Sequence, residues 1–236
     1  SWTFLYASKY FWILLLICFI LIIGSTLFWS SFEQQPTSFN LFADRYTDLN
    51  VFGFDIPSIW FQSLNPIFIL MLAPIVSVIW VWLGKRNLEP NSMAKFSLGM
   101  LLAAAGFGLM IMASKLVVAN PDTLVSPLWL TGSLLLLTLG ELALSPVGLS
   151  SMTKLAPKGM QGQMMGLFFT SLAMGNLVAA FFGGHVSADT IEGLPSLFTT
   201  MTIFLVVTAL ILLALSKPVR AMLDRSEAED EHRNTV

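Results

Sequence analysis

Residues 127–152 read PLWLTGSLLLLTLGELALSPVGLSSM, an almost wholly apolar stretch that carries one carboxylate, Glu141. About 20 apolar residues in a helix cross the ~30 Å hydrocarbon core of a bilayer, so this stretch is long enough to span a membrane. A charged side chain near the centre of such a span costs roughly 2.5–3.5 kcal/mol on insertion scales. An acid that is retained at this cost indicates a functional site, of the kind that holds a proton or a substrate in a transporter.

The whole chain has the composition of a membrane protein. Of its 236 residues, 56% are hydrophobic and 11% are charged, whereas soluble domains contain about 25% charged residues. The apolar runs are continuous, which argues against the short alternating segments of a β-barrel. The sequence therefore predicts an all-α integral membrane fold with six transmembrane helices, at residues 10–34, 61–83, 95–118, 127–152, 163–184 and 196–216.

The basic residues are concentrated on one side of this predicted topology. If the first helix starts in the cytoplasm, every lysine and arginine except Arg45 and Lys115 falls in or beside a cytoplasmic segment. The positive-inside rule then predicts that both ends of the segment are cytoplasmic. Residues 217–236 are polar and acidic, and we expect them to form a frayed cytoplasmic tail.

The chain lacks the residue clusters of an enzyme or a metal site. Cys18 is the single cysteine, and His185 and His232 lie far apart in the sequence. The predicted spans contain no serine–histidine pair, paired aspartates or metal ligands, and no ring-forming filter sequence of a channel. We therefore expect no enzymatic activity, no metal, no cofactor and no nucleic-acid partner.

Polar and small residues share one face of the predicted helix with Glu141. Thr138 precedes it by three residues, and Ser145 and Gly148 follow at steps of four and three, which is typical of a helix that lines a cavity. A buried carboxylate needs an opposite charge, hydrogen bonds or a proton, and no lysine or arginine lies deep in any predicted span. The charge must then come from another domain, a substrate or a proton; alternatively, Glu141 is a neutral acid bonded to a neighbouring helix.

Three other positions have two interpretations each. Asn65 precedes Pro66 at the start of the second predicted helix, where its amide either binds a polar ligand or caps the helix. Pro74 predicts a bend deeper in that helix, which occurs in moving and in static bundles. Glu33, near the outer end of the first helix, either pairs with an arginine as a gate or is hydrated and inert.

Beyond Glu33 the connection to the second helix is long and keeps an apolar periodicity. Leu41, Phe42, Tyr46 and Leu49 fall at helical spacing. The sequence therefore predicts that the first helix continues outward as an amphipathic extension.

Seven segments of the chain match the motifs of one known family: residues 126–129, 138–150, 153–157, 163–166, 32–35, 41–45 and 65–66. Together they resemble the proton-dependent oligopeptide transporters of the major facilitator superfamily. That family has two six-helix halves, and residues 1–236 resemble the carboxy-terminal half only. The resemblance implies one half of a major facilitator fold that requires an absent amino-terminal half.

The resemblance also implies a function. Members of the family carry di- and tripeptides across the cell (inner or plasma) membrane with protons by alternating access, and a proton gradient takes the place of a cofactor. The same fold also suits another small substrate, such as nitrate or an amino acid. A half-transporter that dimerises is a further alternative, but it would set Glu141 against a second acid, so we favour a piece of a longer transporter.

Roles for individual residues follow from the resemblance alone. Glu141 would receive the peptide amino group and exchange a salt bridge with a lysine of the absent half, with Ser145 close by. Asn65 would bond the peptide's amino-terminal region. Phe168 stands where the family often has tryptophan, and would form an aromatic wall of the pocket.

Two acids are gate candidates on the same basis. Glu33 would pair with an arginine of the absent first helix and couple protonation to movement of an outer gate. Asp44 is a weaker candidate for the same gate. With Glu141, they form the predicted proton-coupling set.

Overall fold

The computed structural model describes residues 9–51, 53–154, 156, 159–183 and 191–234. Six of the helices in this part are long and apolar enough to cross a membrane, which confirms the predicted all-α class. The elements in chain order are α2 (Lys9–Phe32), the π-helix η1 (Gln35–Phe39), α3 (Asn40–Tyr46), β1 (Asn50–Val51), β2 (Phe54–Asp55), the 3₁₀-helix η2 (Ser58–Ser63), α4 (Leu64–Lys85), α5 (Ser92–Ala119), α6 (Leu128–Lys154), α7 (Gln161–Gly183) and α8 (Gly193–Asn234).

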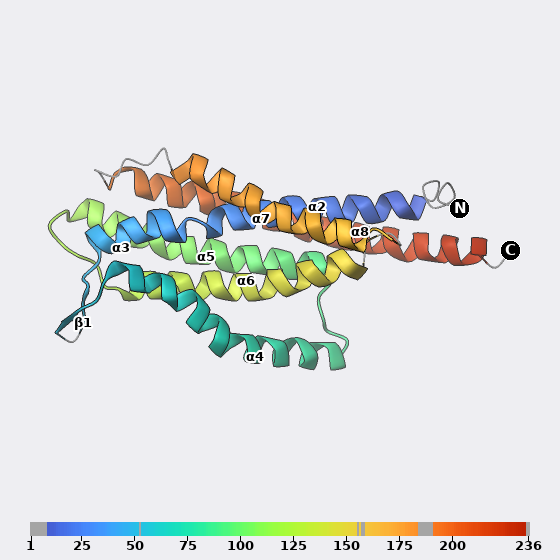
Figure 1. The fold of residues 1–236 in the computed structure, drawn as a ribbon, viewed down its shortest axis with the longest axis horizontal. Coiled ribbons are helices and arrows are strands. Elements are labelled where there is room, and N and C mark those ends of the chain that lie inside the picture. The colour runs from blue at the N-terminus through green and yellow to red at the C-terminus, as the bar shows by residue number, and fades with distance from the viewer. Residues whose placement is uncertain (1–8, 52, 155, 157–158, 184–190, 235–236) are drawn as a thin grey trace.

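The helices form an elongated bundle with two distinct ends. The start of α2 and the end of α8 lie at one end, which we call the terminal end, and the β1–β2 hairpin lies at the other, the hairpin end (Figure 1). α5 packs against α6 and α8, while α2 packs against α7 and α8. α4 lies beside α6.

Two glycines bring α5 and α6 into backbone contact. A Cβ on Gly140 would lie 2.6 Å from the Gly99 carbonyl oxygen, and a Cβ on Gly99 would lie 2.7 Å from that of Gly140. Two turns further on, the Ser133 hydroxyl donates to the Gly106 carbonyl over 2.8 Å. Small residues allow such close approach in membranes, and the contact fixes the rotation of α6 about its axis.

The first span is interrupted near the hairpin end. Pro36 has no backbone N–H, so it cannot donate to the carbonyl of Phe32 as an α-helical residue would. Instead, the Phe39 N–H donates to the Gln34 carbonyl over 3.0 Å, with the five-residue spacing of a π-helix. The extension expected from the sequence is therefore a separate short helix, α3, joined to α2 through η1.

α4 is the least embedded of the long helices. None of its residues is buried, and its main contacts are with α6 and η2. Pro74 lies within it, and Figure 1 shows its Lys85 end standing apart from the bundle. At that end, the Lys95 ammonium of α5 lies 4.7 Å from the centre of the Trp80 ring and pairs with Glu89, which ties α4 to α5.

The last helix is longer than the sequence pattern indicated. We expected a frayed tail from residue 217, but the backbone of α8 stays helical to Asn234. Alanine, methionine, leucine, glutamate and arginine predominate there, and all have high helix propensity. The charged residues did not predict a loop correctly, because glutamate and arginine at i, i+4 spacing stabilise a helix that has no apolar face.

Gly140→Ala should destabilise the protein. The new methyl group meets backbone, which cannot rotate away, so α5 and α6 must separate at a cost of about 1–3 kcal/mol. The measurement is the thermal unfolding midpoint of the purified protein in detergent. Gly108→Ala is the matched control, because a Cβ there meets nothing within 4 Å and alanine is the better helix former. Equal midpoints for the two variants would contradict the close-packing account.

Candidate functional site

Three polar side chains meet where α4 packs against α6: Thr138 is buried, and Asn65 and Glu141 are half-buried. The Asn65 amide nitrogen donates to a Glu141 carboxylate oxygen over 3.0 Å and to the Thr138 hydroxyl oxygen over 3.1 Å. The Thr138 hydroxyl in turn donates to the Leu134 carbonyl over 2.8 Å. Both N–H groups of one amide are thus engaged, and we call Asn65, Thr138 and Glu141 the polar cluster.

The local structure explains why these residues meet. Thr138 and Glu141 are three residues apart on α6, so they lie on the same helix face. Gly140 is held against α5, which turns the Glu141 side of α6 toward α4. Asn65 lies in the first turn of α4, where that helix runs beside α6.

The cluster is electrostatically incomplete. In the part of the chain that the structure describes, no lysine or arginine pairs with Glu141. The half-buried Glu33 is close enough for its charge to act on Glu141. A carboxylate that is held by a neutral amide and lies near a second acid forms a site that attracts a cation: a proton, an amine or a basic side chain.

The other residues predicted from the sequence lie apart from this cluster. Ser145 is half-buried one turn along α6 from Glu141, whereas the Phe168 ring is buried against Gly148. Asp44 is exposed and accepts a hydrogen bond of 3.1 Å from the Ser58 hydroxyl, which links α3 to η2. The roles expected for these residues remain predictions.

Sequence reasoning missed Gln34. Its side chain is fully buried, its amide nitrogen donates to the Ala179 carbonyl of α7 over 3.1 Å, and its amide oxygen accepts from the Ser38 hydroxyl over 2.8 Å. Gln34 therefore links the segment after α2 to α7, and it is the residue that follows Glu33 in the sequence. The signal was available, because a glutamine two residues before a proline at the end of an apolar run marks a break with polar groups to satisfy.

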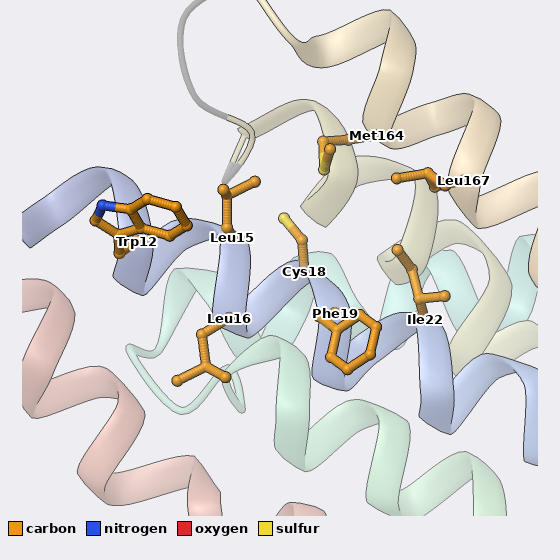
Figure 2. Close-up of a pocket in the computed structure, with 8 residues that line it drawn as sticks. All are labelled: Trp12, Leu15, Leu16, Cys18, Phe19, Ile22, Met164 and Leu167. Carbon is orange, nitrogen blue, oxygen red and sulfur yellow. The ribbon is translucent and has the colours of Figure 1, made fainter. Parts of the chain in front are cut away.

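An open apolar pocket of about 460 Å³ lies between α2 and α7 (Figure 2), and none of its lining residues belongs to the polar cluster. Met164 and Leu167 of α7 face Leu15, Cys18 and Ile22 of α2 across it. It has no acidic lining residue. This pocket therefore offers no charged side chain to a ligand.

Comparison with known proteins assigns the family. The sequence model of the POT family matches residues 12–215. The chain belongs to this family. As a POT segment of six transmembrane helices, it forms one half of a major facilitator fold and part of a multi-pass membrane protein.

Individual POT relatives are similar over most of this chain. "Peptide transporter YePEPT" of Yersinia enterocolitica subsp. palearctica is 51% identical over 215 residues, which cover 91% of this chain and 42% of that protein. "Dipeptide and tripeptide permease B" of Yersinia enterocolitica is 32% identical over 222 residues, which cover 91% of this chain and 45% of that protein. The chain thus spans less than half the length of these relatives.

A solved structure gives the same result for the fold. The crystal structure of peptide transporter POT in complex with sulfate superposes with a TM-score of 0.78 at 38% identity, over 86% of this chain and 40% of that one. Six helices of a POT transporter therefore account for the bundle described above.

Gln34→Leu should lower the stability of the protein. Leucine has a similar volume but leaves the Ser38 hydroxyl and the α7 contact without a partner, which costs about 1–3 kcal/mol for buried groups. Gln163→Leu, on the exposed side of α7, serves as the control. Thermal unfolding of the two variants should show a lower midpoint for Gln34→Leu alone; a shared midpoint would mean that the buried amide contributes nothing.

Proposed function

We propose that this chain is the carboxy-terminal half of a proton-coupled symporter that carries di- and tripeptides across the cell membrane by alternating access. Peptide transporters among the POT relatives support the substrate class. The remaining partners of the proposal are the lipid bilayer, protons and an amino-terminal half with six further helices. A proton gradient, and no bound cofactor, would drive uptake.

The polar cluster is the observation that carries this proposal. Glu141 lies in an apolar span with an amide as its partner and no described cation beside it. A peptide amino group, a proton and a basic side chain of the other half compete for one carboxylate in this scheme. Because only one of them binds at a time, arrival of the peptide releases the other, and this competition couples the proton to the substrate.

The remaining assignments follow from the same scheme. Asn65 already donates to Glu141, so it lies where it can also bond the amino-terminal region of a peptide held there. Ser145 and Phe168 would bound the pocket further along α6 and α7. Glu33 would act with Asp44 as the gate, since its charge reaches Glu141.

The charge distribution supports the orientation. Lys9, Lys85, Arg86 and Lys95 belong to helix ends or connections at the terminal end of the bundle, as does the start of the last basic segment at Lys217. Positive residues favour the cytoplasmic side. We therefore place the terminal end in the cytoplasm and the hairpin end outside.

Glu141→Gln should abolish proton-driven peptide uptake. Glutamine keeps the size and the hydrogen bond of the side chain, but it neither ionises nor binds a proton for release, so accumulation of a labelled dipeptide in proteoliposomes with an imposed proton gradient should fall to the level of empty vesicles. Insertion and yield should stay unchanged. Glu192→Gln, an exposed acid before α8, is the matched control. Retained accumulation by Glu141→Gln would rule out its coupling role.

Unlabelled dipeptides should compete for this uptake, whereas free amino acids and nitrate should not. A second substrate class has one observation in its favour, since a POT transporter of 32% identity was crystallised in complex with 5-aminolevulinic acid. The same proteoliposomes decide between them. Uptake that is insensitive to an excess of dialanine but sensitive to an amino acid or another small metabolite would replace the peptide assignment.

A further inference from the structure

A small polar cavity lies where the break of the first span meets the entry of the second. Its volume open to the centre of a water molecule is about 10 Å³, which is enough for one water molecule. Side chains of η1, α3, η2 and α6 enclose it. They are Gln35, Phe39, Asn40, Phe61, Gln62, Leu130 and Leu134.

Two buried polar atoms of this lining have no partner among the described residues. They are the amide nitrogen of Gln35 and the amide oxygen of Asn40. Gln35 is 8% exposed, so bulk water does not satisfy it. Buried polar groups in proteins are nearly always hydrogen-bonded, and each one left without a partner costs about 1–3 kcal/mol.

The two atoms are complementary. The Gln35 nitrogen is a donor and the Asn40 oxygen is an acceptor, and yet they do not bond one another. A ligand that satisfies both atoms must accept from the first and donate to the second. The lining carries no charged side chain, which argues against a metal cation or an anion.

We propose that this cavity is a binding site for a single internal water molecule, held by Gln35 and Asn40 with the amide of Gln62 as a third partner. The water oxygen accepts from the Gln35 amide nitrogen, and one water hydrogen is donated to the Asn40 amide oxygen. A water molecule still satisfies the site if the nitrogen and oxygen of either amide exchange positions, because water both donates and accepts hydrogen bonds. The site depends on the described residues alone and stands whatever the protein transports.

The location gives the water a structural consequence. Gln62 lies three residues before Asn65, and Leu134 accepts the hydrogen bond of Thr138, so the cavity lies beside the polar cluster on its hairpin side. The water would join η1 and α3 of the first span to η2, which leads into α4. It bridges elements that do not bond through these side chains directly.

X-ray hydroxyl-radical footprinting of the full-length protein in lipid nanodiscs tests the proposal. X-rays split a bound water into a radical that oxidises the nearest aromatic ring, and mass spectrometry locates the oxidised residue. Phe39 and Phe61 line the cavity but are only 2% and 7% exposed. Phe96 is equally buried and does not line it. Oxidation of Phe39 and Phe61 should exceed that of Phe96 several-fold.

Variants separate a held water from accidental solvent. Gln35→Met with Asn40→Leu preserves volume and removes both partners, so oxidation of Phe39 and Phe61 should fall to the level of Phe96, while Gln163→Met leaves it unchanged. The proposal is overturned if wild-type Phe39 and Phe61 are oxidised no more than Phe96, since the cavity is then dry. It is equally overturned if the double variant keeps the wild-type pattern. The wild-type comparison decides the first point even where the variants do not fold.

Discussion

The backbone contact between Gly99 and Gly140 is the constraint on which the candidate site depends. It locks α6 against α5 at one rotation, and Glu141 is the next residue along α6. With any other rotation, Thr138 and Glu141 would not both reach Asn65. A packing requirement for two residues without side chains thus determines where the half-buried acid points.

The rest of the bundle divides into firmly and loosely held parts. α2 and α7 are joined where Gly175 lets the Trp29 backbone approach, and where Gln34 bonds the Ala179 carbonyl. α4 has no buried residue and is held near its start by the polar cluster. A helix with few buried contacts moves at low free-energy cost, and the Asn65–Glu141 hydrogen bond joins this helix to α6, which packs closely against α5.

The sequence predicted the features that depend on local residue patterns. It did not predict the features that depend on how one helix is rotated against another. Span-length apolar runs give the six helices, because the bilayer sets both their length and their composition. Asn65 and Glu141 were each singled out, but their hydrogen bond spans 76 positions and follows from the glycine contact, which no periodicity reveals. Gln34 was missed because a polar residue at a span end resembles an interfacial one until its burial is known.

The hydroxyl groups within the spans differ from the carboxylates in how they find partners. Serines and threonines within the spans donate to backbone carbonyls, as Ser97 does to Ala209 and Thr138 to Leu134, so these hydroxyl groups have their partners within the chain. Glu33 and Glu141 are different, since neither pairs with a cation in the described residues. Hydrogen bonds from an amide orient a carboxylate but do not neutralise it. In the proposed transporter, charge balance would come from a proton, a ligand amine or a basic side chain, and because these exclude one another at one carboxylate, the site would suit exchange rather than permanent pairing.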